Sequence, residues 1–71
     1  MHTDLDVDAL GLLCPLPVLR LRKRMADLPS GARVRLLADD PAALIDVPHF
    51  CAEAGHTFEG NDGHTYLIRK G

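Results

Sequence analysis

The stretch Leu10–Pro17, with the sequence LGLLCPLP, separates two hydrophobic periodicities and decides how the rest of the chain folds. Before it, Leu5–Ala9 alternates apolar and acidic residues, which is the period of a half-buried strand. Pro15 and Pro17 then mark a helix start, because proline is tolerated in the first turn of a helix and not deeper. The chain is therefore expected to pass from a strand into a helix here, with Cys14 at the junction.

The segments after the prolines predict a helix and a second strand. Arg33–Ala38 alternates apolar and polar residues again, which indicates a strand with one solvated face. Pro29–Gly31 ends the helix that precedes it. The apolar residues of that helix recur every three or four positions, which places them on one face: Val18, Leu21, Met25 and Leu28.

A second helix is predicted to begin at Asp39-Asp40-Pro41, because aspartate is a good cap and proline suits the first helical position. Gly55 should end it. Pro48 lies inside and should kink the helix or split it in two. The apolar face expected for this helix consists of Leu44, Val47, Cys51 and Ala54.

Two further strands, Thr57–Glu59 and His64–Arg69, are joined by Gly60–Gly63, which is typical of a hairpin. The order is thus β-α-β-α-β-β. It predicts an α/β (α+β) two-layer sandwich, with two helices on one face of a four-stranded mixed sheet. The 71 residues, 46% apolar and 25% charged, have ordinary globular composition and suit a single domain, residues 1–71.

Charge and cysteine usage narrow the function classes. The net charge of −2 gives no overall attraction to nucleic acid. Two cysteines are too few for a disulfide-stapled secreted domain, and Ala9–Leu19 is too short for a membrane span, so a cytoplasmic protein with reduced thiols is expected. The first helix carries a local basic stripe, which is either a docking surface for an acidic protein or a solvated face: Arg20, Arg22, Lys23 and Arg24.

Cys14 is the residue that could carry chemistry. Its sulfur should face the positive end of the helix dipole, which could lower its pKa by roughly 0.2 to 1.5. The two prolines remove backbone donors, so only the amides of Leu16 and Val18 are left to bond the sulfur. A moderately activated thiol is therefore expected, and such a thiol suits sulfur transfer by exchange.

Several other roles for Cys14 compete with sulfur transfer. It could be a buried core cysteine, or half of a dithiol with Cys51, although Cys51 lies on an apolar stripe and suits the core. A metal site is disfavoured because the spacings show no paired ligands apart from His49-Phe50-Cys51. A cysteine hydrolase would need a histidine base and a substrate cleft, and 71 residues leave little room for one.

The Cys14-Pro15-Leu16-Pro17 run matches the Cys-Pro-x-Pro signature of TusA/SirA-like sulfur carriers. Ala38–Ala42, Asp46–Cys51 and Tyr66–Gly71 resemble the TusA subgroup. The resemblance implies a sulfurtransferase that takes persulfide sulfur on Cys14 from a cysteine desulfurase or a rhodanese-like protein. It would relay the sulfur to an acceptor protein, toward tRNA 2-thiouridine, sulfur oxidation or molybdenum-cofactor sulfuration. Pro15 and Pro17 would stiffen the approach to the thiol, and no cofactor is implied.

The resemblance also implies docking residues. By position, Arg22 and Lys23 match basic residues that dock to the desulfurase, and Asp40 matches an acidic residue of the same interface. Leu16 replaces a glutamate found in tRNA-thiolation members, which should favour a slightly lower Cys14 pKa and a more apolar surface. A carrier that exposes one cysteine to two successive partners is expected to be a monomer.

Two other functions remain open. One is a non-catalytic regulatory or interaction module of the same fold, with an inert thiol. The other is an RNA-binding module. It is disfavoured because the only aromatic residues are Tyr66, Phe50 and Phe58, and Phe50 and Phe58 fall where core is expected.

Overall fold

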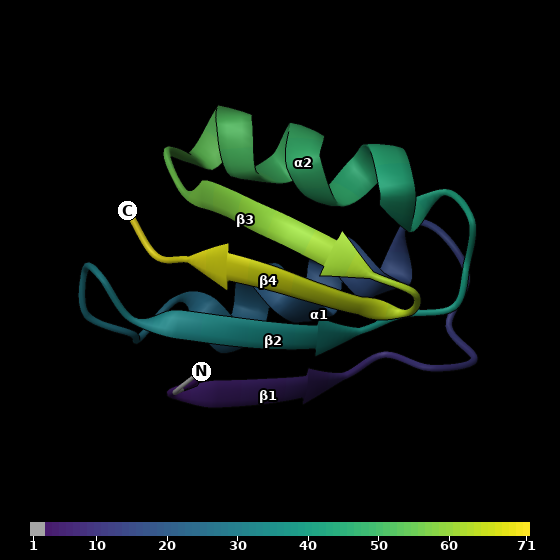
Figure 1. The fold of residues 1–71 in the computed structure, drawn as a ribbon, viewed down its shortest axis with the longest axis horizontal. Coiled ribbons are helices and arrows are strands. Elements are labelled where there is room, and N and C mark those ends of the chain that lie inside the picture. The colour runs from purple at the N-terminus through teal and green to yellow at the C-terminus, as the bar shows by residue number, and fades with distance from the viewer. Residues whose placement is uncertain (1–2) are drawn as a thin grey trace.

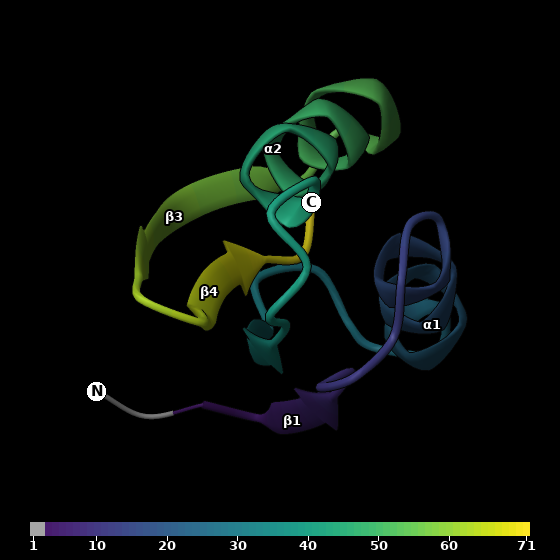
Figure 2. The ribbon, with the colours of Figure 1, turned by 90° about the vertical axis from the view of Figure 1, so that its right-hand side faces the viewer.

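The computed structural model describes residues 3–71, which form one mixed sheet covered by two helices (Figure 1). The strand order is β1-β2-β4-β3, with β1 parallel to β2 and the other two pairs antiparallel. Both helices lie on the same face of the sheet (Figure 2), so the predicted two-layer sandwich is confirmed. The elements are β1 (Leu5–Asp8), α1 (Leu16–Met25), β2 (Arg33–Leu37), α2 (Ala43–Ala54), β3 (Thr57–Asp62) and β4 (Thr65–Arg69).

The core forms where the alternating strands face the helices. Val7 lies opposite Leu36 in the parallel pair, and Val34 lies opposite Ile68 in the antiparallel pair. All four side chains are fully buried, as the alternation of their strands predicts. Their acidic and basic neighbours point to the other face of the sheet, which the helices leave open.

Helix α1 begins at Leu16, with Pro15 as its N-cap residue and Pro17 in its first turn, so the predicted start is confirmed. Leu21 and Met25 are buried against the sheet, whereas Val18 and Leu28 are only partly buried. The difference at Leu28 arises because the helix ends at Met25, before that residue.

Helix α2 differs from its prediction in start and in buried face. It begins at Ala43, because the residues before it form a tighter turn in which the N–H of Ala43 donates to the Asp40 carbonyl at 3.0 Å. The buried residues are Ala43, Val47, Phe50 and Cys51, while the predicted Leu44 and Ala54 are exposed. Burying the ring of Phe50 removes far more apolar surface from water than burying a methyl group.

Pro48 lies inside the continuous helix Ala43–Ala54, so the predicted alternative of a helix split in two was wrong. Proline lacks the N–H that would bond the carbonyl of Leu44, four residues before it. Leu44 lies on the exposed side of the helix, with 56% of its surface accessible, so water can satisfy that carbonyl.

The hairpin is longer and tighter than predicted, because β3 reaches Asp62 and leaves a two-residue turn at Gly63 and His64. The predicted strand start at His64 was therefore wrong by one residue, since β4 begins at Thr65. A register shift between Phe58 and Gly60 makes Glu59 the extra residue of a β-bulge.

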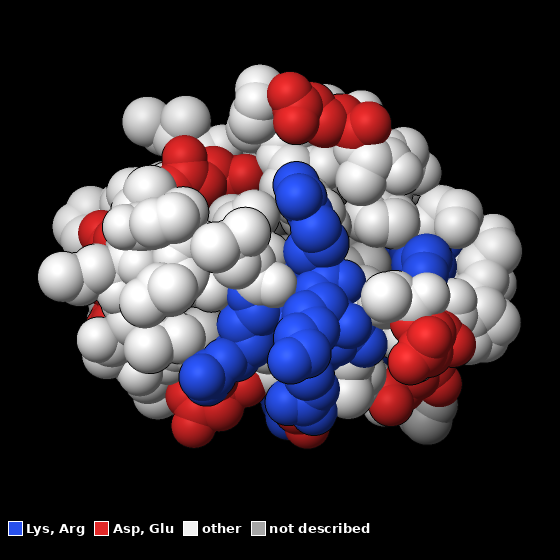
Figure 3. All heavy atoms as spheres, turned by 180° about the vertical axis from the view of Figure 1, so that it is seen from behind, with Lys and Arg blue, Asp and Glu red and all other residues white. Residues whose placement is uncertain are grey.

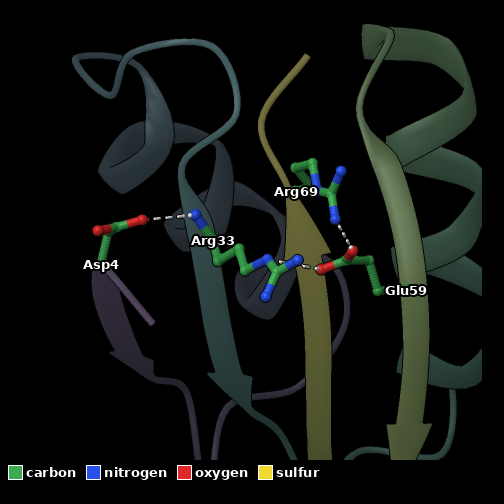
Figure 4. Close-up of polar contacts among 4 residues, drawn as sticks. All are labelled: Asp4, Arg33, Glu59 and Arg69. Carbon is green, nitrogen blue, oxygen red and sulfur yellow. Dashed lines mark hydrogen bonds and ion pairs between the residues drawn. The ribbon is translucent and has the colours of Figure 1, made fainter. Parts of the chain in front are cut away.

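Glu59 joins three strands on the open face of the sheet. Its carboxylate accepts a 2.8 Å hydrogen bond from Arg69 and lies 3.7 Å from Nε of Arg33 (Figure 4). The backbone N–H of Arg33 in turn donates to Asp4 at 2.9 Å. These contacts tie β3, β4 and β2 together and extend to the start of β1.

Candidate functional site

Cys14 lies at the end of the loop between β1 and α1, immediately before the helix, and its side chain is exposed. A buried core cysteine is therefore excluded for Cys14. Its peptide bond to Pro15 is cis. Cys51, by contrast, is 1% exposed, and burial raises the pKa of its thiol to about 11, so its predicted place in the core is confirmed.

Two consecutive aspartates of the β2–α2 loop hold the backbone of the Cys14 loop. The N–H of Gly11 donates to Oδ1 of Asp39 at 3.0 Å, and the N–H of Cys14 donates to Oδ2 of Asp40 at 2.6 Å. The other oxygen of Asp40 accepts the N–H of Ala42 at 3.2 Å. Because carboxylate acceptors form strong hydrogen bonds, these contacts fix the loop against the start of α2.

The sulfur of Cys14 has a partner on α2 that the sequence analysis did not identify. Its S–H donates to Oδ2 of Asp46 across a distance of 3.0 Å. This hydrogen bond raises the pKa of the Cys14 thiol above its ordinary value. Desolvation and the negative charges of Asp46 and Asp40 act in the same direction. The unloaded thiol is thus mostly protonated at neutral pH.

The prediction of a moderately activated thiol was therefore wrong. That prediction considered only the dipole of α1 and the amides near its start. The N–H of Leu16 instead donates to the carbonyl of Leu13 at 2.8 Å, and Pro17 has no N–H. The favourable effect of the helix terminus is small, and two carboxylates brought in from the β2–α2 region outweigh it.

A hollow of about 200 Å³ opens between α1 and α2 beside the sulfur. Arg22 enters it from α1, and its guanidinium lies 5.4 Å from the centre of the Phe50 ring, which is cation–π distance. His49 and Glu53 line the same hollow from α2 and pair with each other at 3.0 Å. The hollow therefore presents a cation, an apolar floor and carboxylates to anything that approaches Cys14.

The four basic residues of α1 line two different hollows of the surface. Arg22 lies in the hollow beside Cys14, while the other three line a separate groove of about 470 Å³. Arg20 is also anchored there, since it donates to the carbonyl of Asp8 at 2.8 Å. Figure 3 shows basic side chains gathered in a band on the face that carries α1. The groove is lined by Leu12, Leu16, Leu19, Arg20, Lys23 and Arg24.

Exposed apolar side chains surround the Cys14 loop. Leu13 and Leu16, on either side of the Cys14–Pro15 pair, are 70% and 49% exposed. Ile45, next to Asp46 on α2, is 75% exposed. Apolar groups beside a basic band are typical of a surface that another protein covers.

The structure bears on the competing functions. Within residues 3–71, no group of three or more His, Cys, Asp or Glu side chains is placed to hold a metal ion. Phe50 and Tyr66 are buried and Phe58 is partly buried, so they form no exposed platform for stacking bases. Neither helix of the described chain is long and apolar enough to span a membrane.

Asp46 and Asp39 are the site residues that sequence reasoning missed. Asp39 was interpreted as part of a helix start and Asp46 as the first residue of a family-like segment, and neither was assigned a contact with the Cys14 loop. Nothing in the neighbouring sequence of Asp46 could indicate contact with Cys14, which lies 32 positions earlier in the chain. Only the packing of α2 beside α1 brings these groups together.

Comparison with known proteins gives consistent matches over almost the whole chain. The model of a family described as sulfurtransferase TusA matches residues 5–70. A sulfur carrier protein TusA from Pseudomonas syringae pv. syringae (strain B728a) is 43% identical over 74 residues, which cover 99% of this chain and 88% of that protein. The crystal structure of a SirA-like protein from Desulfitobacterium hafniense is 27% identical, with a TM-score of 0.68 and 90% coverage of both chains.

Proposed function

Because the chain belongs to the sulfurtransferase TusA family, we propose that it carries sulfur as a persulfide on Cys14 between a donor and an acceptor protein. The observation that supports this most strongly is the position of Cys14. It is exposed at the start of α1, yet its loop is held by hydrogen bonds to Asp39 and Asp40. A carrier needs such a thiol, reachable by two partners in turn and held in a constant geometry.

The transfer requires no oxidant and no metal. The Cys14 thiolate attacks the terminal sulfur of a donor cysteine persulfide, a new S–S bond forms at Sγ, and the S–S bond of the donor breaks. The donor cysteine leaves as a thiolate and takes up the proton that Cys14 loses. Attack by an acceptor thiolate on the terminal sulfur reverses the process and restores the Cys14 thiol.

The proposed donor is a cysteine desulfurase or a rhodanese-like protein. The hollow with Arg22, the groove with Arg20, Lys23 and Arg24, and the exposed leucines would together form the docking surface. Asp40, which holds Cys14, would lie at the edge of the same interface. An apolar centre with basic groups suits a partner surface that carries acidic residues around an apolar patch.

We also propose that the protein acts as a monomer in the cytoplasm. The same cysteine must be uncovered for donor and acceptor, which a dimer interface over this face would prevent. Both cysteines are free, as a reducing compartment would keep them. The acceptor would be a sulfur-relay protein, toward tRNA 2-thiouridine or sulfur oxidation.

Intact mass spectrometry tests the carrier function directly. The protein is incubated with a cysteine desulfurase and cysteine, and separately with a rhodanese and thiosulfate. The wild type and Cys51→Ala should gain one sulfur atom that a reductant removes, and Cys14→Ser should gain none. Loading of Cys14→Ser, or no loading of the wild type by either donor, would contradict the proposal.

A second candidate function is a non-catalytic interaction module of the same fold. One observation favours it, namely that Asp46 and Asp40 raise the pKa of the Cys14 thiol. Such a module would bind its partner equally well as the wild type and as Cys14→Ser, and would gain no sulfur from either donor.

A further inference from the structure

The carboxylate of Asp46 faces the sulfur from the neighbouring helix rather than from the loop that carries it. Oδ2 of Asp46 is 3.0 Å from Sγ of Cys14, and among residues 3–71 it provides the side-chain hydrogen bond to that sulfur. Asp40 adds a second negative charge nearby, although its contact is with the Cys14 backbone. The cation of the hollow, Arg22, lies over the Phe50 ring. The sulfur is therefore paired with a carboxylate, and a positive charge lies elsewhere in the hollow.

We propose that Asp46 is a positioning residue that distinguishes the empty carrier from the sulfur-loaded one. The inference rests on the proposed function, because it concerns the two states of Cys14 that sulfur transfer creates. In the empty state the S–H donates to the carboxylate, which holds the thiol protonated and turned toward α2. In the loaded state Asp46 drives the terminal sulfur away from α2, toward solvent and the acceptor.

The chemistry of the two states differs at one hydrogen atom. An empty Cys14 has an S–H donor, and an anionic carboxylate is a strong acceptor for it. A loaded Cys14 has Sγ bonded to carbon and to sulfur, so no hydrogen remains there and the bond to Asp46 is lost. The terminal sulfur of a persulfide is more acidic than a thiol and carries negative charge, which Asp46 and Asp40 repel.

This arrangement protects the empty carrier and exposes the loaded one. Thiolates, rather than thiols, react with oxidants, alkylating agents and disulfides, so a protonated Cys14 is protected between transfers. A donor that brings a cation against Asp46 would weaken the acceptor and release the thiolate for attack. The surface of the donor around its persulfide is accordingly expected to be positively charged where it meets α2.

The other charged groups around the sulfur come from each neighbouring element. Arg22 lines the hollow from α1, and Asp40 contacts the Cys14 backbone from the loop before α2. His49 and Glu53 line the hollow from later turns of α2, and they pair with each other. Asp46 differs from all of these because its oxygen contacts the sulfur itself.

The rate of alkylation of Cys14 by iodoacetamide, measured from pH 6 to pH 10, tests the empty state. In Asp46→Asn the amide can donate to a thiolate, so the profile should shift to lower pH and the rate at pH 7 should rise at least about threefold. Asp46→Ala should shift in the same direction. Glu53→Gln, which removes a carboxylate that lines the hollow without contacting the sulfur, should stay within about twofold of the wild type.

Slower alkylation of the Asp46 variants would overturn the proposal. If Asp46 were a general base that activates the thiol, Asp46→Asn would react more slowly than the wild type. An unchanged profile in both Asp46 variants would show that the contact has no effect on the sulfur.

Nuclear magnetic resonance of the wild type tests the loaded state without a substitution at Asp46. The carboxyl carbon signal of Asp46 is compared in empty protein, in loaded protein and in Cys14→Ala, which has no S–H. Loading should move the signal to its position in Cys14→Ala, and a signal that stays at the empty position would overturn the proposal.

The two proposals can fail separately. If the wild type gains no sulfur, the carrier function fails, while the alkylation profile still reports on Asp46. If the wild type loads but the Asp46 variants alkylate like the wild type, the carrier function stands and the discrimination by Asp46 fails.

Discussion

The backbone N–H of Cys14 donates a 2.6 Å hydrogen bond to Oδ2 of Asp40, a residue 26 positions later in the chain. The other oxygen of that carboxylate accepts the N–H of Ala42 in the turn that leads into α2. A single side chain thus holds the reactive loop and the start of the second helix. A variant at Asp40 will therefore alter loop geometry as well as any contact with a partner.

Asp40→Ala should destabilise the fold by about 1–3 kcal/mol, because it leaves two backbone donors without their carboxylate acceptor. Urea unfolding measures the loss, and hydrogen exchange at the Cys14 amide should become faster. Asp62→Ala is the control, since Asp62 is exposed at the hairpin, and it should stay within about 0.5 kcal/mol of the wild type. Equal effects of the two substitutions would contradict the role of Asp40.

Arg22→Gln should slow sulfur loading by a persulfidated donor by roughly threefold to tenfold, because Arg22 lines the hollow beside Cys14. The initial rate is measured at low and at moderate salt, and the difference between variants should shrink as salt rises. Arg35→Gln removes the same charge from the open face of the sheet, where Arg35 pairs with Asp6. If both variants slow loading equally, net charge matters and the position of Arg22 does not.

Glu59→Ala should lower the free energy of unfolding by about 1–2 kcal/mol, because its half-buried carboxylate bonds Arg69 and pairs with Arg33. Sulfur loading should be unaffected, since Glu59 lies on the face away from the helices (Figure 4). A double-mutant cycle with Arg69→Ala separates the ion pair from other effects. Strict additivity of the two substitutions would show that the pair contributes nothing.

The protein should lose stability in alkaline solution because of Cys51. Burial raises the pKa of this thiol from its ordinary value of 9.0 to about 11. Between these values the unfolded chain releases the proton and the folded chain retains it, so stability falls as pH rises. The slope from this group is at most about 1.4 kcal/mol per pH unit.

Urea unfolding at pH 8 and at pH 10.5 measures this alkaline loss, with Cys51→Ala as the reference that lacks the thiol. The wild type should lose more stability than the variant over this range. Tyr66, whose pKa burial and Asp40 also raise, contributes with the same sign in both proteins. An equal loss in the two proteins would contradict the effect of Cys51.

Most of the fold could be predicted because the spacing of apolar residues matches the side-chain period of each helix or strand. The alternation in Arg33–Leu37 places Val34 and Leu36 in the core, where both are fully buried. The prolines mark the start of α1 as predicted. The pattern misplaced part of the buried face of α2, because several apolar residues lie close together there and the volume of Phe50 decides which side packs inward.

The sequence predicted the position of the reactive cysteine in the candidate site but not the groups that surround its sulfur. Cys14 could be identified from its neighbours in the chain, because prolines and a helix start are local signals. The reactivity of its sulfur could not be predicted, because it depends on Asp46 and Asp40. These two residues lie in the β2–α2 region, far from Cys14 in the chain.

The sequence by itself determined the order of the elements, the exposed cysteine at the start of α1 and the buried cysteine in α2. These follow from local backbone preferences and hydrophobic period, which neighbouring residues impose. Only the tertiary structure decided that the pKa of the Cys14 thiol is raised and that Arg22 lines the hollow beside Cys14, whereas the other basic residues of α1 line a different groove. Electrostatic effects depend on distances of a few ångströms in space, and the packing of α2 beside α1 determines those distances.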